Sequence, residues 1–472
     1  MRAAPDRKGV LTLQKKMTEG TIWKQIFFFS LPLMLGNLLQ QLYNTVDGIV
    51  VGNYVSQDAL AAVGGVFALT FLALAISMGM GGGGGIIVAQ MYGAGRMSEM
   101  RRAVSTILIM LVSIGAVLSV LGAVFSRFLV EKVIRMTDAN IKELGIVYFR
   151  IYALGLIVQY LYNAISSILR ALGDSKSTLY FLCVTAVLNI ILDLAFVLKL
   201  GWGVFGVALA TVISQVVCAA VSLVYMLKRY PMFRFKREEF VFDPKVFGLS
   251  LKLGIPATVQ SMVVSFGNIF MQRLINSFGA ATMTAFAVGH RVESYTFIPV
   301  FSLNIGVSTF TGQNVGAGKF ERVTKGLRQT LVMSVVIEVF MCVLLYTLAP
   351  MFTRLFGMET GSEATRQAIE MLHFMSFTFV LFALYQPTCG LLQGSGDAIW
   401  ATISSITTLG IRVICAYLLA YVFDFGYASA WVTMPIGWIC ASAVTYSRIL
   451  RGKWKTKAVV KPVGESGEAA EA

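Results

Sequence analysis

Pro32-Leu-Met-Leu-Gly-Asn-Leu-Leu-Gln-Gln-Leu-Tyr-Asn-Thr-Val-Asp47-Gly48 is the stretch that decides the fold class. It lies in an apolar segment, about Ile26 to Val51, that is long enough to cross a bilayer, which takes roughly 20 apolar residues. Four of its polar residues are three or four positions apart: Asn37, Gln40, Asn44 and Asp47. They therefore share one helix face. Because an aspartate in mid-membrane costs on the order of 2.5–3.5 kcal/mol, we expect this face to line a wet cavity.

The composition excludes an ordinary soluble protein. The chain has 472 residues, of which 57% are hydrophobic and 13% charged, against about 25% charged in soluble domains. The first 16 residues are polar and basic, and the apolar run after them is too long for a signal peptide. Met17 is a candidate natural start, which would make residues 1–16 an upstream extension.

The net charge of +15 raises the alternative of nucleic-acid binding. With the N-terminus placed inside, most Lys and Arg residues fall on the cytoplasmic side, as the positive-inside rule requires. We therefore expect no nucleic-acid partner, and an anionic lipid surface is a second reading of the basic clusters. The six cysteines lie in apolar spans without metal-ligand spacing, so we expect no metal and no cofactor.

Twelve apolar spans are predicted, and segments of this length cross lipid as helices. They fall near residues 25–52, 59–90, 103–126, 144–168, 177–199, 203–227, 248–276, 281–311, 326–349, 368–392, 398–422 and 427–448. The predicted divisions are a cytoplasmic N-terminal segment (1–24), a first lobe (25–227), a cytoplasmic linker (228–247), a second lobe (248–449) and a cytoplasmic tail (450–472). The fold class is an all-α polytopic membrane protein with both termini in the cytoplasm.

An internal repeat joins the two lobes. Similar residues recur 223 to 225 positions apart, as in Pro32 and Pro256, or Gly93-Ala-Gly95 and Gly316-Ala-Gly318. Because six is an even number, both copies enter the membrane from the same side and are parallel repeats. That plan is typical of secondary transporters, whose binding sites lie at or between the repeats.

Two further helices of the first lobe carry polar stripes. The fourth span has Tyr152, Gln159 and Asn163, and the fifth has Thr185, Asn189 and Asp193. Single amides and hydroxyls often only bond neighbouring helices, but buried carboxylates are too costly for that role. By depth along their helices, Asp47 and Asp193 meet in the outer half of one cavity, where they can take a proton or hold a cation.

The second lobe repeats the architecture without these acids. Asn268 takes the place of Asn44, and Met271 takes the place of Asp47. Arg291 and Glu293 are two residues apart, so each needs a partner elsewhere; an ion pair is the first reading and a substrate contact or coupling role the second. Glu338 is a third candidate for a proton site, ranked below the aspartates because no polar stripe accompanies it.

A run of five glycines and a set of tyrosines can each be interpreted in more than one way. Gly81 to Gly85 indicate close helix packing or a flexible bend. Five tyrosines are candidates to line the cavity and stack on cationic drugs, although packing is the commoner use of this residue: Tyr43, Tyr148, Tyr152, Tyr160 and Tyr162.

The opening stripe, the Gly312-Gln-Asn-Val-Gly-Ala-Gly-Lys319 loop and the doubled six-helix plan resemble the MATE (multidrug and toxic compound extrusion) family, in its DinF-like bacterial branch. The resemblance implies a V-shaped, two-lobe antiporter in the cell (inner) membrane that exports organic cations or amphipathic toxins against H⁺ or Na⁺. It implies coupling at Asp47, Asp193, Asn189 and Asn163, and gating at Pro32. Another branch uses an acid in the seventh helix, where this chain has Gln260.

The predicted function is therefore a multidrug efflux antiporter working by alternating access, and we expect a monomer. The alternative is a flippase or exporter of a lipid-linked or polar metabolite on the same fold, because fold alone does not set the substrate. An enzyme is not expected, since the chain has only two histidines and no HExxH motif.

Overall fold

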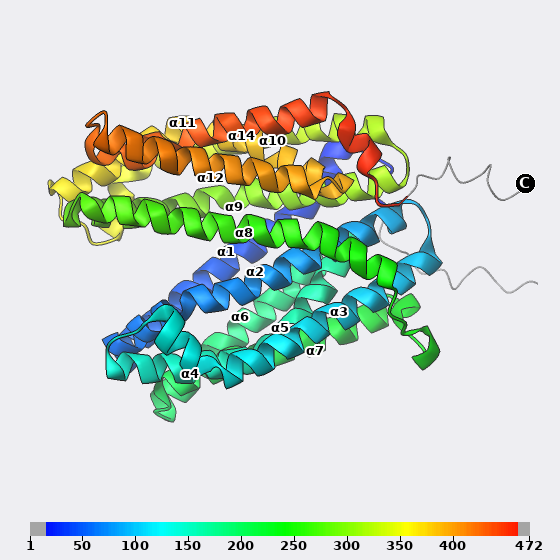
Figure 1. The fold of residues 1–472 in the computed structure, drawn as a ribbon, viewed down its shortest axis with the longest axis horizontal. Helices are drawn as coiled ribbons and strands as arrows, with labels where there is room; N and C mark the ends of the chain where they lie inside the picture. The colour runs from blue at the N-terminus through cyan, green and yellow to red at the C-terminus, as the bar shows by residue number, and fades with distance from the viewer. Residues whose placement is uncertain (1–15, 461–472) are drawn as a thin grey trace, which may run out of the picture. The chain divides into compact units, whose positions relative to one another are not determined.

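The protein is all-helical. The structure is a computed structural model that describes residues 16–460, and within them it contains no β-strand (Figure 1). The long helices are α1 (Ile22–Val50), α2 (Gln57–Gly93), α3 (Met97–Val124), α5 (Ala139–Ala171), α6 (Lys176–Leu194), α7 (Gly203–Arg229), α8 (Pro244–Ser277), α9 (Ala280–Gly316), α10 (Phe320–Leu355), α11 (Glu363–Ser395), α12 (Ala398–Tyr421) and α14 (Met434–Leu450). Two short helices, α4 (Ser126–Phe128) and α13 (Ser429–Val432), stand between them.

Eleven of these helical segments are long and apolar enough to cross a membrane. The twelfth predicted span is α9, which has 37 residues and is therefore about 55 Å long at 1.5 Å per residue. Its apolar stretch is interrupted by the charged residues Arg291 and Glu293 and by amides and hydroxyls. Its length and its packing against α10 and α11 fit the predicted plan of twelve helices.

Two helices run through residues that often interrupt helices. Helix α1 continues past Pro32 and ends in a π-helical turn, Val51–Val55. Helix α2 continues through Gly81 to Gly85 without a break, so the glycines do not interrupt the helix. Gly83 serves close packing, since a Cβ on it would lie 2.6 Å from the backbone nitrogen of Gly254 in α8.

The first compact unit contains Leu35–Ile255. Its centre is α5, which packs against α2, α3 and α7, while α6 packs against α7. Long helices with side chains buried on one side and exposed on the other are expected for a bundle in lipid, where the outer surface stays apolar. Exposed residues such as Val120, Val187 and Ile191 follow this pattern.

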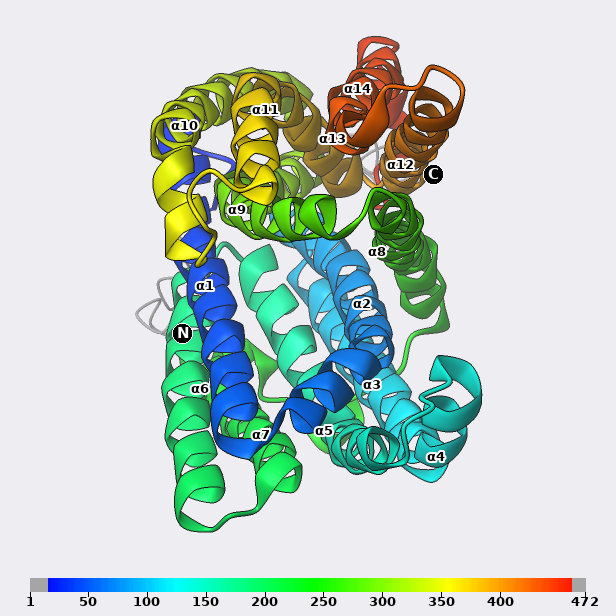
Figure 2. The same ribbon diagram turned by 90° about the vertical axis from the view of Figure 1, so that its left-hand side faces the viewer.

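The second unit contains Gly20–Met34 and, among the described residues, 256–460. Its centre is α11, which packs against α9, α10 and α14, while α12 packs against α14 (Figure 2). These are the counterparts of the contacts in the first unit, so the internal repeat extends to helix packing. The division between the units falls inside α1 and α8, immediately after Met34 and before Pro256.

Candidate functional site

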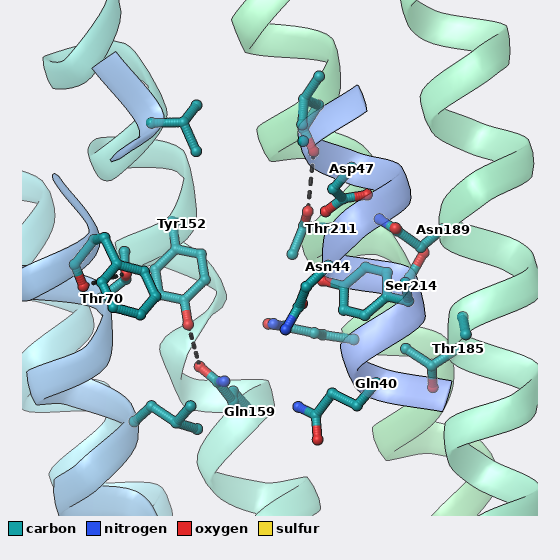
Figure 3. Close-up of a pocket in the computed structure, with 18 of the residues that line it drawn as sticks. Gln40, Asn44, Asp47, Thr70, Tyr152, Gln159, Thr185, Asn189, Thr211 and Ser214 are labelled. Atoms are coloured by element: carbon teal, nitrogen blue, oxygen red, sulfur yellow. Dashed lines mark hydrogen bonds between the residues drawn. The ribbon is translucent and has the colours of Figure 1, made fainter. Parts of the chain in front are cut away.

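A cavity of about 400 Å³ lies within the first unit. Its walls come from α1, α2, α5, α6 and α7. Nine residues predicted from the sequence line it: Gln40, Tyr43, Asn44, Asp47, Tyr152, Gln159, Asn163, Thr185 and Asn189. All of them except Tyr43 and Asn163 are labelled in Figure 3. Helical spacing alone places the first four on one face of α1, and the structure turns that face toward α5 and α6.

Asp47, Asn189 and Asp193 form a connected group at one end of this cavity. Asp47 on α1 and Asn189 on α6 lie side by side (Figure 3). With the Asn189 amide oriented so that its nitrogen faces the carboxylates, that nitrogen donates to Asp47 Oδ1 at 3.0 Å and to Asp193 Oδ2 at 3.2 Å. Asp193 is fully buried behind the lining, and its Oδ1 has no hydrogen-bond partner among the described residues. One amide thus holds two carboxyl groups of different helices together.

Several other polar residues of the lining are held by hydrogen bonds. Tyr152 donates from its hydroxyl to Gln159 Oε1 at 3.2 Å, and Asn163 donates from Nδ2 to Ser77 Oγ at 3.0 Å. Thr185 donates to the carbonyl of Phe181 at 2.7 Å, within its own helix. These bonds fix the orientation of the amides and hydroxyls before any ligand enters.

Four of the five candidate tyrosines line the cavity: Tyr43, Tyr148, Tyr152 and Tyr162. The rings of Tyr148 and Tyr152 are nearly parallel, with centroids 6.3 Å apart. The prediction for Tyr160 was wrong. Its side chain is fully buried and donates to the carbonyl of Ala73 at 2.7 Å, so it joins α5 to α2.

Helix α7 supplies a wall that the sequence reasoning missed. Its lining residues are Thr211, Ser214, Gln215 and Cys218. Ser214 Oγ and Gln215 Oε1 are buried and have no hydrogen-bond partner among the described residues. A spacing of three or four residues marks this stripe in the sequence, but its members are small or uncharged and resemble ordinary helix contacts.

The lining has an acidic side chain and, among the described residues, lacks basic ones. Within the described part of the chain, the lining contains the carboxylate of Asp47 and no Lys, Arg or His. Asn37 lies one turn before Gln40, half-buried, and is not part of the lining. The cavity thus combines one carboxylate with amides, hydroxyls and aromatic rings.

The second unit replaces the acids by apolar contacts. Met271, at the position equivalent to Asp47, and Ala416, equivalent to Asp193, are both buried in the hydrophobic core of that unit. Gln260 donates to Ser405 Oγ at 2.6 Å and accepts from Gln393 Nε2 at 3.1 Å. Asn268 is exposed.

Glu293 and Arg291 contact different residues, as their spacing predicts. Glu293 is buried and lies 2.9 Å from Nδ1 of His290, one turn earlier. The carboxylate of Glu293 and the guanidinium of Arg412 also attract each other electrostatically. Arg291 is exposed, and its guanidinium lies 6.0 Å from the ring centre of Phe356.

Glu338 on α10 is fully buried, and neither carboxyl oxygen has a hydrogen-bond partner among the described residues. The expectation that no polar stripe accompanies it was wrong. Buried Thr330 and Ser334 precede it at intervals of four residues, which places them on its face of the helix.

Comparison with known proteins identifies the family. The MatE family model matches the chain twice, at residues 32–195 and 256–418. The chain is 30% identical over 459 residues to a probable multidrug resistance protein, YoeA of Bacillus subtilis, covering 96% of this chain and 98% of the relative. It is 26% identical over 451 residues to YpnP of the same organism, a probable multidrug resistance protein, covering 93% and 97%.

Solved structures show the same fold. A MATE transporter in complex with MaL6 superposes with a TM-score of 0.87 at 24% identity, covering 93% of this chain and 99% of the other. An outward-facing multidrug resistance MATE transporter superposes with a TM-score of 0.85 at 24% identity, covering 93% and 98%. The doubled match, the relatives of full length and the shared fold lead to one conclusion: the chain belongs to the MatE family of multi-pass membrane transporters, the MATE multidrug efflux transporters.

Proposed function

We propose that this transporter exports small organic cations or amphipathic molecules in exchange for H⁺, with Na⁺ as the alternative coupling ion. The single observation that carries the proposal is the pair Asp47 and Asp193, bridged by Asn189 at the wall of the cavity. Two carboxylates this close repel each other unless a proton or a cation lies with them. The pair can therefore bind either the coupling ion or the positive charge of a substrate.

The lining supports the substrate class. A volume of about 400 Å³ falls in the range of small-molecule sites. Tyrosine rings and a carboxylate suit a flat molecule with a positive charge, because aromatic faces attract cations. The amides of Gln40, Asn44 and Gln159 add orienting contacts.

In the proposed cycle, the proton and the cationic substrate compete for the carboxylates of this pair. In the outward-open state a proton binds at Asp47 and Asp193, the carboxylate charge is neutralised, and the cationic substrate leaves. In the inward-open state the proton leaves and a new substrate binds. We propose that α1 rearranges at Pro32, which removes one backbone donor from the helix and lies two residues before the division between the compact units. Both termini would lie in the cytoplasm, with the transporter acting as a monomer in the cell membrane.

A polar-metabolite exporter is the second candidate. One relative, 24% identical over 390 residues, is named an FAD transporter, in Shewanella oneidensis. A molecule with phosphate groups would need cationic side chains in the cavity, and the described lining has none. The charge of the cavity thus favours cations.

The test is export from everted vesicles with H⁺ and Na⁺ gradients imposed separately, using ethidium as the organic cation. We expect export to follow the H⁺ gradient in Na⁺-free buffer, and to fall at least tenfold in Asp47→Asn at equal membrane abundance. Asp58→Asn is the matched control, since it makes the same charge change on an exposed side chain at the start of α2. Full export by Asp47→Asn would contradict the proposal, and export driven only by Na⁺ would reassign the ion.

A further inference from the structure

An open groove of about 550 Å³ lies within the second unit. It is formed by the start of α1 and the first third of α10. Its lining residues are Trp23, Lys325, Arg328, Gln329, Val332 and Met333. The proposed transport chemistry uses none of them.

The two sides of this groove are fastened to each other. Arg322, on the first turn of α10, donates from Nη2 to the carbonyl of Gly20 at 2.8 Å and to Gln25 Oε1 at 2.9 Å. Its guanidinium also lies 5.5 Å from the ring centre of Phe310. These contacts hold the segment before and after Trp23 against α10, so the groove is built into the fold.

The groove carries uncompensated positive charge. Lys325 and Arg328 are exposed and three residues apart, so they point to the same side of α10. Within the described residues neither forms an ion pair. Lys24 is not part of the lining, but it adds positive charge beside it, with its Nζ 5.7 Å from the ring centre of Trp23. An anionic group is the natural partner for such a cluster.

A polar atom in the same groove also lacks a partner. The side-chain oxygen of Gln329 is buried without a hydrogen bond among the described residues. A buried acceptor without a donor costs free energy. A ligand that offers a hydroxyl beside its anionic group would satisfy this oxygen while the cations hold the charge.

An apolar track leads away from the cations along α10. Val332, Val336, Phe340 and Val343 are each more than half exposed, and their spacing of four, four and three residues places them on one helix face. From Val332 to Val343 the track is about 16 Å long at 1.5 Å per residue. That length matches half of the ~30 Å hydrocarbon core, which is the depth of one leaflet.

Trp23 indicates that the groove lies at the depth of the membrane–water interface. It is partly exposed at the beginning of α1, and tryptophan is enriched where membrane meets water. A charged cluster at that level, followed by an apolar track one leaflet deep, fits a phospholipid and not a free phosphate ion. Basic pockets at such positions are known to take anionic headgroups.

We propose that this groove binds an anionic phospholipid of the phosphatidylglycerol type. Its phosphate contacts Lys325 and Arg328, its glycerol hydroxyls face Gln329, and one acyl chain lies along Val332, Val336 and Phe340. The site is independent of the proposed coupling chemistry in the first unit, so either proposal can fail alone.

The test is retention of added lipid by the purified, detergent-solubilised protein in native mass spectrometry. The probes are dioleoyl phosphatidylglycerol, dioleoyl phosphatidylcholine and soluble glycerol 3-phosphate. We expect the protein to retain phosphatidylglycerol at least tenfold better than phosphatidylcholine, and the double variant Lys325→Gln/Arg328→Gln to lose that preference.

The control is Lys228→Gln/Lys245→Gln, which removes the same charge from exposed lysines of the first unit and should keep the preference. An unchanged melting temperature without lipid shows that the variants fold alike. The proposal is overturned if the double variant keeps the preference, if both lipids bind equally well, or if glycerol 3-phosphate displaces the lipid at equal concentration. The last outcome would indicate a site for a free phosphate group.

Discussion

At the level of single residues, the two units differ in what they bury at equivalent positions. Asp47 and Asp193 in the first unit correspond to Met271 and Ala416 in the second, which belong to its hydrophobic core. The same helix positions therefore accept either acids or apolar side chains. Because the fold forms without acids at these positions, the aspartates are better explained by ion chemistry than by packing.

Glu338 is the buried acid whose role a stability measurement can decide. It has no hydrogen-bond partner among the described residues, and burying an unpartnered polar group costs about 1–3 kcal/mol in proteins. Glu338→Leu should therefore stabilise the detergent-solubilised protein by about 1–2 kcal/mol, seen as a higher Tm, with export unchanged.

The companion variant Glu338→Gln keeps an unpartnered polar group at the site and should give little or no increase in Tm. A loss of export in Glu338→Leu at equal abundance would mean instead that the carboxyl group takes part in transport.

The residues of the cavity could be predicted only in part, for a physical reason. The stripe of Gln40, Asn44 and Asp47 follows from the period of one helix, which the sequence contains. The contribution of Ser214 and Gln215 depends on how α7 is rotated against its neighbours. The spacing of these residues marks one helix face, but which neighbour that face meets is set by packing across the whole unit.

At the level of helices, α2 illustrates how a run of glycines is used. A Cβ on Gly83 would lie 2.6 Å from the backbone nitrogen of Gly254, whereas a Cβ on Gly82 would meet nothing within 4 Å. Gly83→Ala should therefore push α8 away and lower the free energy of unfolding by roughly 1–3 kcal/mol. Thermal unfolding in detergent measures the change.

Gly82→Ala is the matched control on the adjacent residue. Since alanine is the better helix former by about 0.5–1 kcal/mol, this variant should be neutral or slightly stabilising. Equal losses of stability in both variants would show that the glycines act through chain flexibility and not through contact.

The existence of the long helices follows from the apolar runs, but their ends do not. The span predicted at 326–349 is helix α10, Phe320–Leu355, and the span predicted at 25–52 continues to Val55 through a π-helical turn. Apolar runs report the part of a helix in contact with lipid. The helix continues into the polar interface, where residues such as Arg322 and Lys325 extend it.

At the level of the whole molecule, the repeat predicted from the sequence reappears in the packing of each unit. The helices that pack against α5 in the first unit are the repeat equivalents of those that pack against α11 in the second. The compact units nevertheless divide α1 and α8 internally, at Met34 and Pro256. Sequence similarity locates the repeat. It does not predict which unit each part of α1 and α8 packs with, because that depends on tertiary contacts.

The central claim is that the first unit exchanges a proton for a cationic substrate at Asp47 and Asp193. The most direct measurement is proton release when ethidium binds to the purified protein in weakly buffered, Na⁺-free solution. Because substrate and proton compete for the same carboxylates, binding should release about one proton per ethidium in the wild type and should weaken as pH falls. Asp47→Asn should abolish the release, while Asp58→Asn should keep it. Undiminished proton release in Asp47→Asn, or ethidium binding without release in the wild type, would contradict this account.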